Sequence, residues 1–307
     1  MSERIRLGLV GVGKIARDQH LPALAASEDF ALVATASQGP QLDEVPGHPS
    51  IEALLAAEDI DAVSICTPPR GRHAIARAAI EAGKHVMLEK PPAATLAEIA
   101  DLAERARARG VTLFTSWHSR EAGAVDRAGE WLADKRVTGV RIVWKEDIRK
   151  WHPGQEWIVE AGGFGVFDPA INALSIATRI LPEPLLVESA AFEVPAGRGA
   201  PLRATVAMRC GDAPASADLD FLQTGPQTWD LEVDTDGGAL RLSMGGAILH
   251  LPGEPDLTWP DREYPRLYAR FAALVREGAS DVDLRPFQLV ADAFVLAEHR
   301  MGEPFAF

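Results

Sequence analysis

A lysine that follows a short apolar segment is the first candidate for chemistry in this sequence. Lys90 comes after Glu89 at the end of the apolar run His85–Leu88, and Pro91 and Pro92 follow it directly. A lone lysine is usually a solvated surface charge. Prolines fix the backbone here, so this side chain is expected to hold a defined position. Lys90 is therefore a candidate for proton transfer, a role that lysine takes when its pKa is lowered.

Two further polar residues are spaced to act together. Asp168 and Asn172 are four residues apart, so they share one face of a helix if this segment is helical. A structural interpretation stays open for each of them. Asp168 followed by Pro169 is also typical of a helix N-cap with proline at the first helical position, and Asn172 could be only a buried amide.

A glycine-rich turn follows the first apolar run. The sequence Gly11-Val-Gly13-Lys-Ile-Ala16 comes directly after Ile5–Val10. In such a turn the first glycine permits the tight bend, the second lets a pyrophosphate approach the backbone, and the alanine allows close packing of helix and strand. The N–H groups at the helix start would receive the phosphate charge. The turn predicts a dinucleotide site, with a purely structural glycine turn as the alternative.

The choice between NAD and NADP depends on the end of the second strand. That strand ends in Thr35-Ala36-Ser37-Gln38, with no carboxylate to hold a ribose 2′-hydroxyl and no arginine for a 2′-phosphate. Ser37 and Gln38 can hydrogen-bond either form. We therefore expect NADP or NAD to be used, with some preference for NADP, unless both residues only form an ordinary turn.

The first third of the chain alternates apolar runs with alanine-rich helical segments. This texture predicts a doubly wound parallel sheet covered by helices on both faces, a Rossmann domain. The expected strands are Ile5–Val10, Ala31–Ser37, Ala62–Thr67, His85–Leu88 and Val111–Thr115, and the expected helices span about 14–26, 50–57, 71–82 and 95–109.

After Trp117 the pattern changes to that of an α+β domain with an open, mainly antiparallel sheet. We place a dinucleotide-binding domain at residues 1–118 and a substrate-binding and oligomerisation domain at 119–307, and the last helix is a candidate to pack back on the first domain. The elements expected here are helices at Ala124–Ala133, Pro169–Ile180, Pro265–Arg276 and Pro286–Arg300, a strand within Val137–Ile148, several strands between 187 and 251, and a loop at 195–201.

Three motifs in order give a resemblance to a known family. The sequence combines Gly11-x-Gly13-x-x-Ala16, Thr67-Pro68-Pro69 and Glu89-Lys90-Pro91, and it resembles over its whole length the oxidoreductases named for glucose–fructose oxidoreductase and inositol dehydrogenase, the Gfo/Idh/MocA family. It is most similar to the family's bacterial L-arabinose and D-galactose 1-dehydrogenases, in the segments Gly13–Pro22, Trp117–Arg120, Trp144–Gly154 and Gly165–Ser175.

The resemblance implies an NAD(P)-dependent enzyme that oxidises an aldose, D-galactose or L-arabinose, at C1 to the lactone. It implies a catalytic group of Lys90, Asp168 and Asn172. The sugar would contact these three and also His118, Glu146, Trp151 and His152. The cofactor would contact Gly11, Gly13, Lys14, Ile15, Ser37, Gln38, Thr67, Pro68, Pro69, His73, Glu89 and Lys90.

The sequence departs from the wider family at one catalytic position. Many members have Asp-x-x-x-His with histidine proposed as proton acceptor, but Asn172 stands here, and an amide cannot be a general base. The role then falls to Lys90 or Asp168. We favour Lys90, oriented by Asp168, because the positive charge of an oxidised nicotinamide would lower the pKa of a neighbouring ammonium group.

Alternatives remain for the sugar residues and for the activity. His118, Glu146, Trp151 and His152 could each be structural, and Trp229 is a weaker pocket candidate. Another activity of the family, on inositol, xylose or glucose, is a rival. A non-catalytic sugar or NAD(P) sensor is a second rival, which the presence of Lys90 and Asp168 disfavours. D-galactose and L-arabinose stay joined because they differ only by a CH2OH group at C5.

Composition limits the kinds of binding partner and site that the protein is expected to have. The formal charge of −13, from 31 basic and 44 acidic residues, disfavours binding to nucleic acid or to an anionic membrane. The two cysteines, Cys66 and Cys210, lack metal-site spacing, so we expect no metal, and low cysteine content fits the cytoplasm. We expect neither a signal peptide nor a membrane span. A homodimer is expected to form through an uncovered apolar face of the second sheet.

Overall fold

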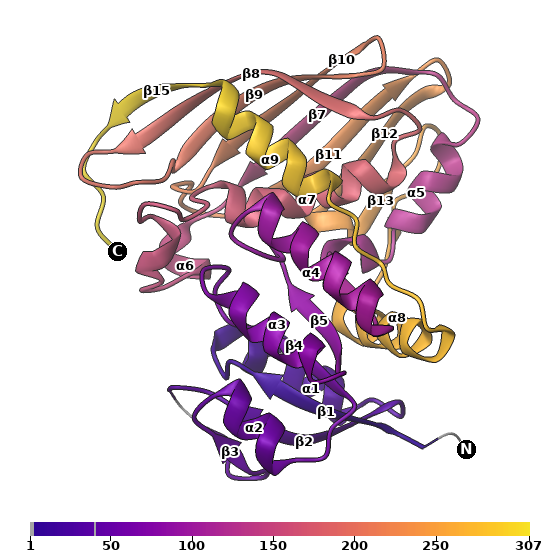
Figure 1. Cartoon of the computed structure of the whole chain (residues 1–307). Helices are drawn as coiled ribbons and strands as arrows, with labels where there is room; N and C mark the ends of the chain where they lie inside the picture. Colours follow the sequence, from indigo (N-terminus) through magenta and orange to yellow (C-terminus); the bar gives the residue numbers. More distant parts are fainter. Residues whose placement is uncertain (1–2, 40) are drawn as a thin grey trace. The chain divides into compact units, whose positions relative to one another are not determined.

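The computed structural model describes residues 3–39 and 41–307, and the chain divides into two compact units (Figure 1). The first unit comprises the chain up to His118 together with Arg262–Asp283. The second comprises Ser119–Asp261 and Leu284–Phe307. The predicted division placed everything after residue 118 in one domain, and it therefore missed the return of 262–283 to the first unit.

The first unit is built on a six-stranded parallel sheet with the order β3-β2-β1-β4-β5-β6. The order reverses beside β1, which is the doubly wound arrangement of a Rossmann fold, as predicted. The strands are β1 (Ile5–Val10), β2 (Phe30–Ala36), β3 (Gly47–His48), β4 (Ala62–Ile65), β5 (His85–Glu89) and β6 (Leu113–Ser116).

Two groups of helices pack on this sheet. One group, in series, is α2 (Ile51–Ala57), α3 (Arg72–Glu81) and α4 (Leu96–Arg109). The other pairs α1 (Leu21–Ala25), which continues a π-helical turn η1 (Ala16–His20), with α8 (Glu263–Glu277).

Helix α8 belongs to the first unit because its apolar face completes that unit's core. Tyr268 and Phe271 are buried against Phe30, with ring centroids 5.5 Å apart in both pairs. Phe271 also stacks on Phe114 at 6.0 Å. An amphipathic helix is stabilised where its apolar stripe is covered, and here the cover lies more than 140 residues earlier in the sequence.

The second unit contains a nine-stranded mixed sheet with the order β14-β13-β12-β11-β7-β10-β9-β8-β15. β10 pairs in parallel with β7, and β15 pairs in parallel with β8, whereas the other neighbours are antiparallel. The strands are β7 (Val137–Lys145), β8 (Leu185–Pro195), β9 (Arg203–Cys210), β10 (Ala213–Asp220), β11 (Thr228–Thr235), β12 (Gly238–Ser243), β13 (Ile248–His250), β14 (Leu257–Thr258) and β15 (Ala297–Gly302).

Long helices cover one face of this sheet (Figure 1). They include α5 (Val125–Leu132), α7 (Phe167–Ile180) and α9 (Arg285–Leu296). The shorter pieces are η2 (His118–Glu121, whose first residue belongs to the first unit), α6 (Ile148–Trp151), η3 (Glu156–Ile158) and η4 (Met244–Gly246). The last helix was predicted to reach Arg300, which is wrong. The helix ends at Leu296 because Ala297–Gly302 forms β15 instead. The backbone N–H and C=O groups of β15 form hydrogen bonds with the neighbouring strand β8.

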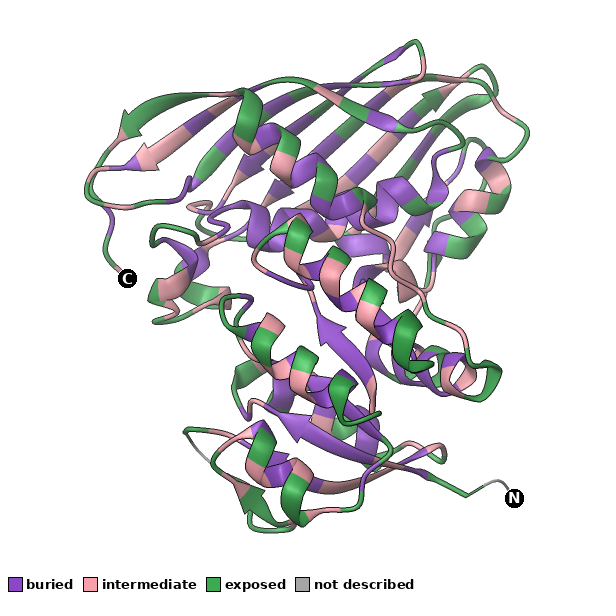
Figure 2. Ribbon diagram, viewed as in Figure 1, coloured by how far each residue is buried: buried purple, intermediate pink, exposed green. Residues whose placement is uncertain are grey.

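The other face of the sheet is polar. Residues along β9 alternate strictly between exposed and buried, and Figure 2 shows this alternation across the sheet. The exposed positions carry ion pairs such as Arg203 with Glu193 at 2.8 Å and Lys145 with Asp218 at 2.5 Å. Leu186 on β8 and Met301 on β15 are nevertheless exposed, so a contact between two copies through an uncovered apolar face stays a prediction. In the described part of the chain, no helix is long and apolar enough to cross a membrane.

Candidate active site

The glycine turn has the geometry that a phosphate needs. Gly11 has φ +91° and donates its N–H to the carbonyl of Ala36 at 2.8 Å. A Cβ at Gly11 would lie 3.0 Å from the Thr67 nitrogen, whereas a Cβ at Gly13 would meet no atom within 4 Å. Gly11 is thus required by the backbone, while the space beside Gly13 is open to a ligand. These features fit a dinucleotide pyrophosphate.

The two residues after Gly13 have defined surroundings. Lys14 forms an ion pair with Asp18 one turn later in the same helix. This pair partly neutralises the charge of Lys14. Ile15 is partly buried and packs against the core that contains Leu9, Ala16 and Cys66. Only their backbone N–H groups at the start of the helix are therefore well suited to a phosphate.

The loop after β2 carries Ser37 and Gln38. The Ser37 hydroxyl accepts the N–H of Gly39 at 3.1 Å, and Gln38 is exposed. Arg17 donates to the carbonyl of Gln41 at 3.3 Å, and Gln41 itself donates to the carbonyl of Ser37 at 2.8 Å. Arg17 is a cation at this loop that the sequence analysis missed, because it was sought next to Ser37 in sequence and comes instead from the first helix.

The turns after β4 and β5 are joined by a buried arginine that the sequence analysis also missed. Arg72, which begins α3, donates to the backbone carbonyls of Thr67, Glu89 and Pro91. Of the predicted contacts in the first turn, Thr67 is half-buried, Pro68 is exposed and Pro69 is buried.

The predicted cofactor contact His73 has a partner within the fold. Its Nε2 lies 2.7 Å from Asp101 on α4, and this pairing holds α3 to α4. The structure thus gives His73 a packing role, and a cofactor contact for it stays a prediction.

Glu89 is buried in the first unit, directly before Lys90 in the sequence. Its carboxylate accepts the backbone N–H of Lys90 at 2.8 Å and the hydroxyl of Tyr264 at 2.6 Å, and it lies 3.0 Å from Nε2 of His20. Burial by itself would raise the pKa of Glu89, but the hydrogen bond and charge of His20 hold it well below its usual range. Burial likewise opposes a charge on His20, yet its polar neighbours, Cys66 foremost, raise its pKa well above the ordinary value.

His118 is the last residue of the first segment of the first unit, and its contacts lie within that unit. Its Nδ1 lies 2.5 Å from Glu263, and its ring stacks on Tyr264 at 5.3 Å between centroids. His118 and Lys90 both belong to this unit, whereas the other predicted sugar contacts belong to the second.

In the second unit, two predicted carboxylates, Glu146 and Asp168, lie on either nitrogen side of the predicted imidazole, His152. His152 Nε2 lies 3.7 Å from a carboxylate oxygen of Glu146, and His152 Nδ1 lies 3.9 Å from one of Asp168. Both carboxylate side chains are almost fully buried, at 3% and 4% exposure, while the imidazole is 20% exposed. Two buried carboxylates beside a partly open imidazole offer several hydrogen-bonding groups to a polyhydroxylated ligand.

The strand β7 and two helices position this cluster. Glu146 follows β7, and its backbone bonds to Asp220 at 2.9 Å and Gln223 at 3.1 Å. Helix α6 ends at Trp151, directly before His152.

Helix α7 supplies the remaining two predicted residues. It begins at Phe167 with Val166 as N-cap and no side-chain cap, so Asp168 lies within the first turn and the capping interpretation is wrong. Asn172 follows one turn later, and its Oδ1 is buried with no hydrogen-bond partner in the described residues. This amide oxygen is an acceptor that the fold leaves unused.

Three tryptophans form an aromatic surface at the same cluster. Trp229 on β11 donates its Nε1–H to Glu146 at 2.7 Å. Its ring stacks on Trp144 at 5.7 Å between centroids and lies 5.0 Å from Trp151 at a tilt of 52°. Trp229 was considered a weak candidate, but it contacts both Glu146 and Trp151. Its strand alternation gives no signal for this, because the contact depends on the pairing of β11 with β7.

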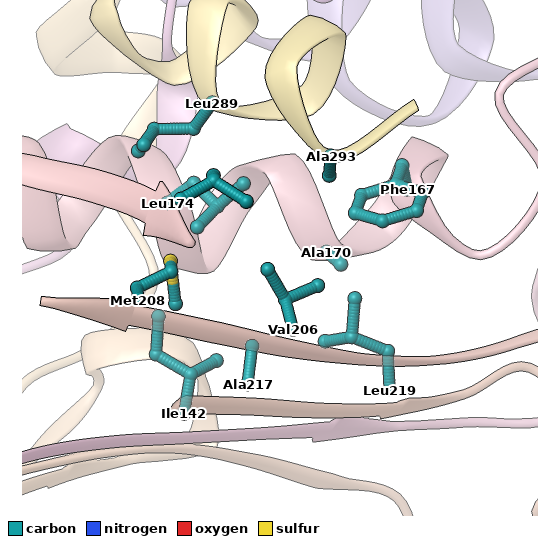
Figure 3. Close-up of a pocket in the computed structure, with 11 residues that line it drawn as sticks. Ile142, Phe167, Ala170, Leu174, Val206, Met208, Ala217, Leu219, Leu289 and Ala293 are labelled. Atoms are coloured by element: carbon teal, nitrogen blue, oxygen red, sulfur yellow. The ribbon is translucent and has the colours of Figure 1, made fainter. Parts of the chain in front are cut away.

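A small cavity elsewhere in the second unit is not this site. It lies between α7, α9 and the sheet (Figure 3), has a volume of about 10 Å³ and is lined only by apolar side chains, such as Phe167, Val206 and Leu289. A site for a sugar needs polar groups, so this cavity is an imperfection of core packing.

Comparison with known proteins agrees with the fold and the motifs. Residues 5–116 match the family described as "Oxidoreductase family, NAD-binding Rossmann fold" (GFO_IDH_MocA). A galactose 1-dehydrogenase of Pseudomonas fluorescens is 43% identical over 305 residues, covering 98% of each chain.

Solved structures agree as well. The crystal structure of a D-galactose-1-dehydrogenase from Rhizobium etli is 50% identical and superposes with a TM-score of 0.95, covering 100% of this chain and 99% of that one. A 3-ketoreductase from Actinomadura kijaniata, solved with NADP and TDP-benzene, shares the fold at 20% identity with a TM-score of 0.85, covering 98% and 100% of the two chains. The chain is a member of the Gfo/Idh/MocA family of NAD-binding oxidoreductases.

Proposed function

We propose that the protein is an aldose 1-dehydrogenase that oxidises D-galactose at C1 to the lactone and also accepts L-arabinose. The observation that carries the proposal is the cluster of Glu146, His152 and Asp168 beside Trp229. It is supported by the 43% and 50% identity to galactose 1-dehydrogenases over nearly the whole chain.

The cluster suits a pyranose for two physical reasons. Carboxylates and an imidazole accept and donate hydrogen bonds to sugar hydroxyls, and indole rings cover the apolar C–H face of the ring. Asn172 adds an acceptor without a partner of its own. A pocket that forms hydrogen bonds to the hydroxyls at C1 to C4 accepts both sugars. The two differ only by the CH2OH group at C5, and such a group changes rates by only about 10–200-fold where the pocket has room for it.

We assign the cofactor to the first unit and the sugar contacts, other than Lys90 and His118, to the second unit. The turn of Gly11 and Gly13 and the following helix start would hold the pyrophosphate. The bound nicotinamide supplies the hydride acceptor for C1. Ser37, Gln38 and the missed cation Arg17 favour NADP over NAD while excluding neither, since no carboxylate at the end of β2 repels a 2′-phosphate.

Lys90 is assigned as the acceptor of the proton from the C1 hydroxyl, with Asp168 as the alternative. Lys90→Ala is expected to lower kcat by at least ~10²-fold, as loss of an acid–base group does, with Lys84→Ala as the control. Lys84 is a half-buried lysine of the same unit that donates to the carbonyl of Ile60 at 2.7 Å and has no predicted part in the site. If Asp168→Asn alone abolishes turnover while Lys90→Ala does not, the assignment passes to Asp168.

The test of the proposed function is a panel of aldoses with each cofactor, followed by absorbance of the reduced nicotinamide. The highest kcat/KM is expected with D-galactose or L-arabinose. A higher kcat/KM with inositol, xylose or glucose would assign another activity of the family, and no reduction with any of them would favour a sensor.

A homodimer through the second sheet is part of the proposal. Because the exposed face of that sheet is charged, a contact there would be polar and weakened by salt. Sedimentation at low and high salt tests it, and a monomer in both would remove this part.

A further inference from the structure

Arg72 is a buried cation whose guanidinium donates to carbonyl groups of two different turns. Its residue exposure is 2%. The guanidinium donates to Thr67 in the turn after β4, at 3.1 Å from Nε, and to Glu89 and Pro91 in the turn after β5. Buried charges are expensive unless they are well hydrogen-bonded, so a guanidinium in this position indicates a specific requirement.

The two carbonyls in the second turn are those directly before and after Lys90. The carboxylate of Glu89 accepts the N–H of Lys90 itself at 2.8 Å. Two buried charged side chains therefore hold the backbone of residues 89–91, one by its carbonyls and one by its N–H. The segment that carries Lys90 is thus held at three backbone atoms.

We propose that Arg72 is a positioning residue for Lys90, which it holds by clamping the turns after β4 and β5 together. The inference rests on the proposed function, in which Lys90 accepts the proton. Arginine is required because its planar fork presents several donors in fixed directions, whereas a lysine ammonium is a single point on a flexible stem. A displacement of ~1 Å at a reacting group is enough to lower a rate about 10²-fold.

The test compares Arg72→Met and Arg72→Lys with a matched control. Arg77→Met is the control, because Arg77 lies on the same helix, is half exposed and pairs with Glu81. Arg72→Met is expected to lower kcat for D-galactose by about 10²-fold, with KM for D-galactose nearly unchanged, since the sugar residues of the second unit are untouched. Arg77→Met is expected to behave as the wild type.

Chemical rescue separates positioning from general stability. Millimolar guanidinium chloride added to Arg72→Ala is expected to restore kcat at least ~10-fold, because the truncated side chain leaves room for the ion, which replaces the lost donors, whereas equal sodium chloride restores nothing. Wild-type kcat in Arg72→Met, or a loss in Arg72→Ala that guanidinium does not reverse in a protein with wild-type circular dichroism, would overturn the inference. If Arg72→Met does not fold, Arg72→Lys decides, and wild-type kcat in that variant would also overturn it.

Failure of this inference is distinguishable from failure of the proposed function. A low rate in Lys90→Ala together with a normal rate in Arg72→Met removes only the role of Arg72. A normal rate in Lys90→Ala removes the proposed proton acceptor, and the inference about Arg72 with it.

Discussion

At the residue scale, the hydrogen bond from Trp229 to Glu146 is the contact on which the proposed sugar site most depends. Glu146 is buried, and the indole N–H at 2.7 Å fixes one of its oxygens. Trp229→Phe keeps an aromatic ring but removes the donor. A hydrogen bond to a charged group contributes about 1.5–3 kcal/mol, so we expect KM for D-galactose to rise by about 10–100-fold.

Trp131→Phe provides the control for this variant. Trp131 lies on α5, where its ring contacts Lys135 at 4.4 Å, and it has no part in the cluster. Initial rates over a range of D-galactose concentrations give KM for both variants. An unchanged KM in Trp229→Phe would show that the aromatic surface does not position the sugar ligands.

Cofactor preference is also decided by single residues. Ser37→Asp introduces a carboxylate at the end of β2, which repels a 2′-phosphate and binds a 2′-hydroxyl. The ratio of kcat/KM for NADP to that for NAD is expected to fall at least ~10-fold, in line with one lost charge-assisted interaction, while KM for D-galactose stays constant. Steady-state kinetics with both cofactors measures this, and an unchanged ratio would mean that residue 37 does not face the ribose.

The types of most site residues could be predicted from the sequence, but several partners could not. Glu146, His152 and Asp168 were expected near a sugar, and they do lie together. Arg17 and Arg72 were missed because each donates to backbone carbonyls of another segment. Every residue type has a backbone carbonyl, so the sequence does not show which carbonyl an arginine contacts.

At the element scale, the two glycines in the turn between β1 and the first helix have different roles. Gly11 is needed for the backbone conformation, whereas Gly13 leaves open space beside the turn. Gly13→Ala adds a methyl group where no atom lies within 4 Å, so stability is expected to stay at the wild-type level. The affinity for NADPH is expected to fall at least ~10-fold, because the methyl group fills the space that a pyrophosphate needs. Nicotinamide fluorescence and thermal unfolding measure the two effects.

Gly11→Ala is the matched comparison in the same turn. Its φ of +91° and the 3.0 Å approach to Thr67 make an alanine strained, at a cost of about 1–3 kcal/mol. Gly11→Ala is thus expected to lose stability as well as affinity. Wild-type affinity in Gly13→Ala would contradict the proposed phosphate site.

The buried pair of Glu89 and His20 gives the first unit a pH dependence. The pKa of Glu89 is lowered, so its stabilisation is present above the ordinary glutamate value and is lost as pH falls below about 4.3. The pKa of His20 is raised, so its stabilisation is present below about 6.5 and is lost as pH rises through the higher folded value.

Glu89→Gln is therefore expected to lower the free energy of unfolding near pH 6, by about 3–5 kcal/mol, as loss of one partner of a buried pair does. The difference from wild type should shrink below about pH 4. Urea unfolding at several pH values measures it, with the exposed Glu104→Gln as control. A difference that is constant with pH would mean that Glu89 is not ionised in the folded protein.

The elements predicted correctly are those with strong local signals. The predicted strands and helices of the Rossmann sheet match because glycine turns and continuous apolar runs mark them, whereas the two-residue strand β3 was not predicted. Strand β15 was predicted as helix, since Ala297–Gly302 contains no breaker before Gly302, and only its pairing with β8 decides its conformation. The assignment of α8 to the first unit depends on Phe30 and Phe114, which no local pattern reveals.

At the scale of the whole molecule, a Rossmann unit and a mixed-sheet unit are carried by one chain that crosses between them three times. Strand-like runs separated by glycine, proline and aspartate turns predicted the sheet of the second unit, but the ion pairs on its exposed face were not predicted. On the opposite face, Ala204, Val206, Met208 and Cys210 of β9 are buried, and helices cover that face.

The central claim is that a hydride leaves C1 of D-galactose, and isotopic transfer tests it most directly. D-Galactose labelled with deuterium at C1 is incubated with the protein and NADP, and the reduced nicotinamide is analysed by mass spectrometry. The account predicts one deuterium in the nicotinamide ring. Reduced nicotinamide without deuterium, or no reduction at all, would contradict it.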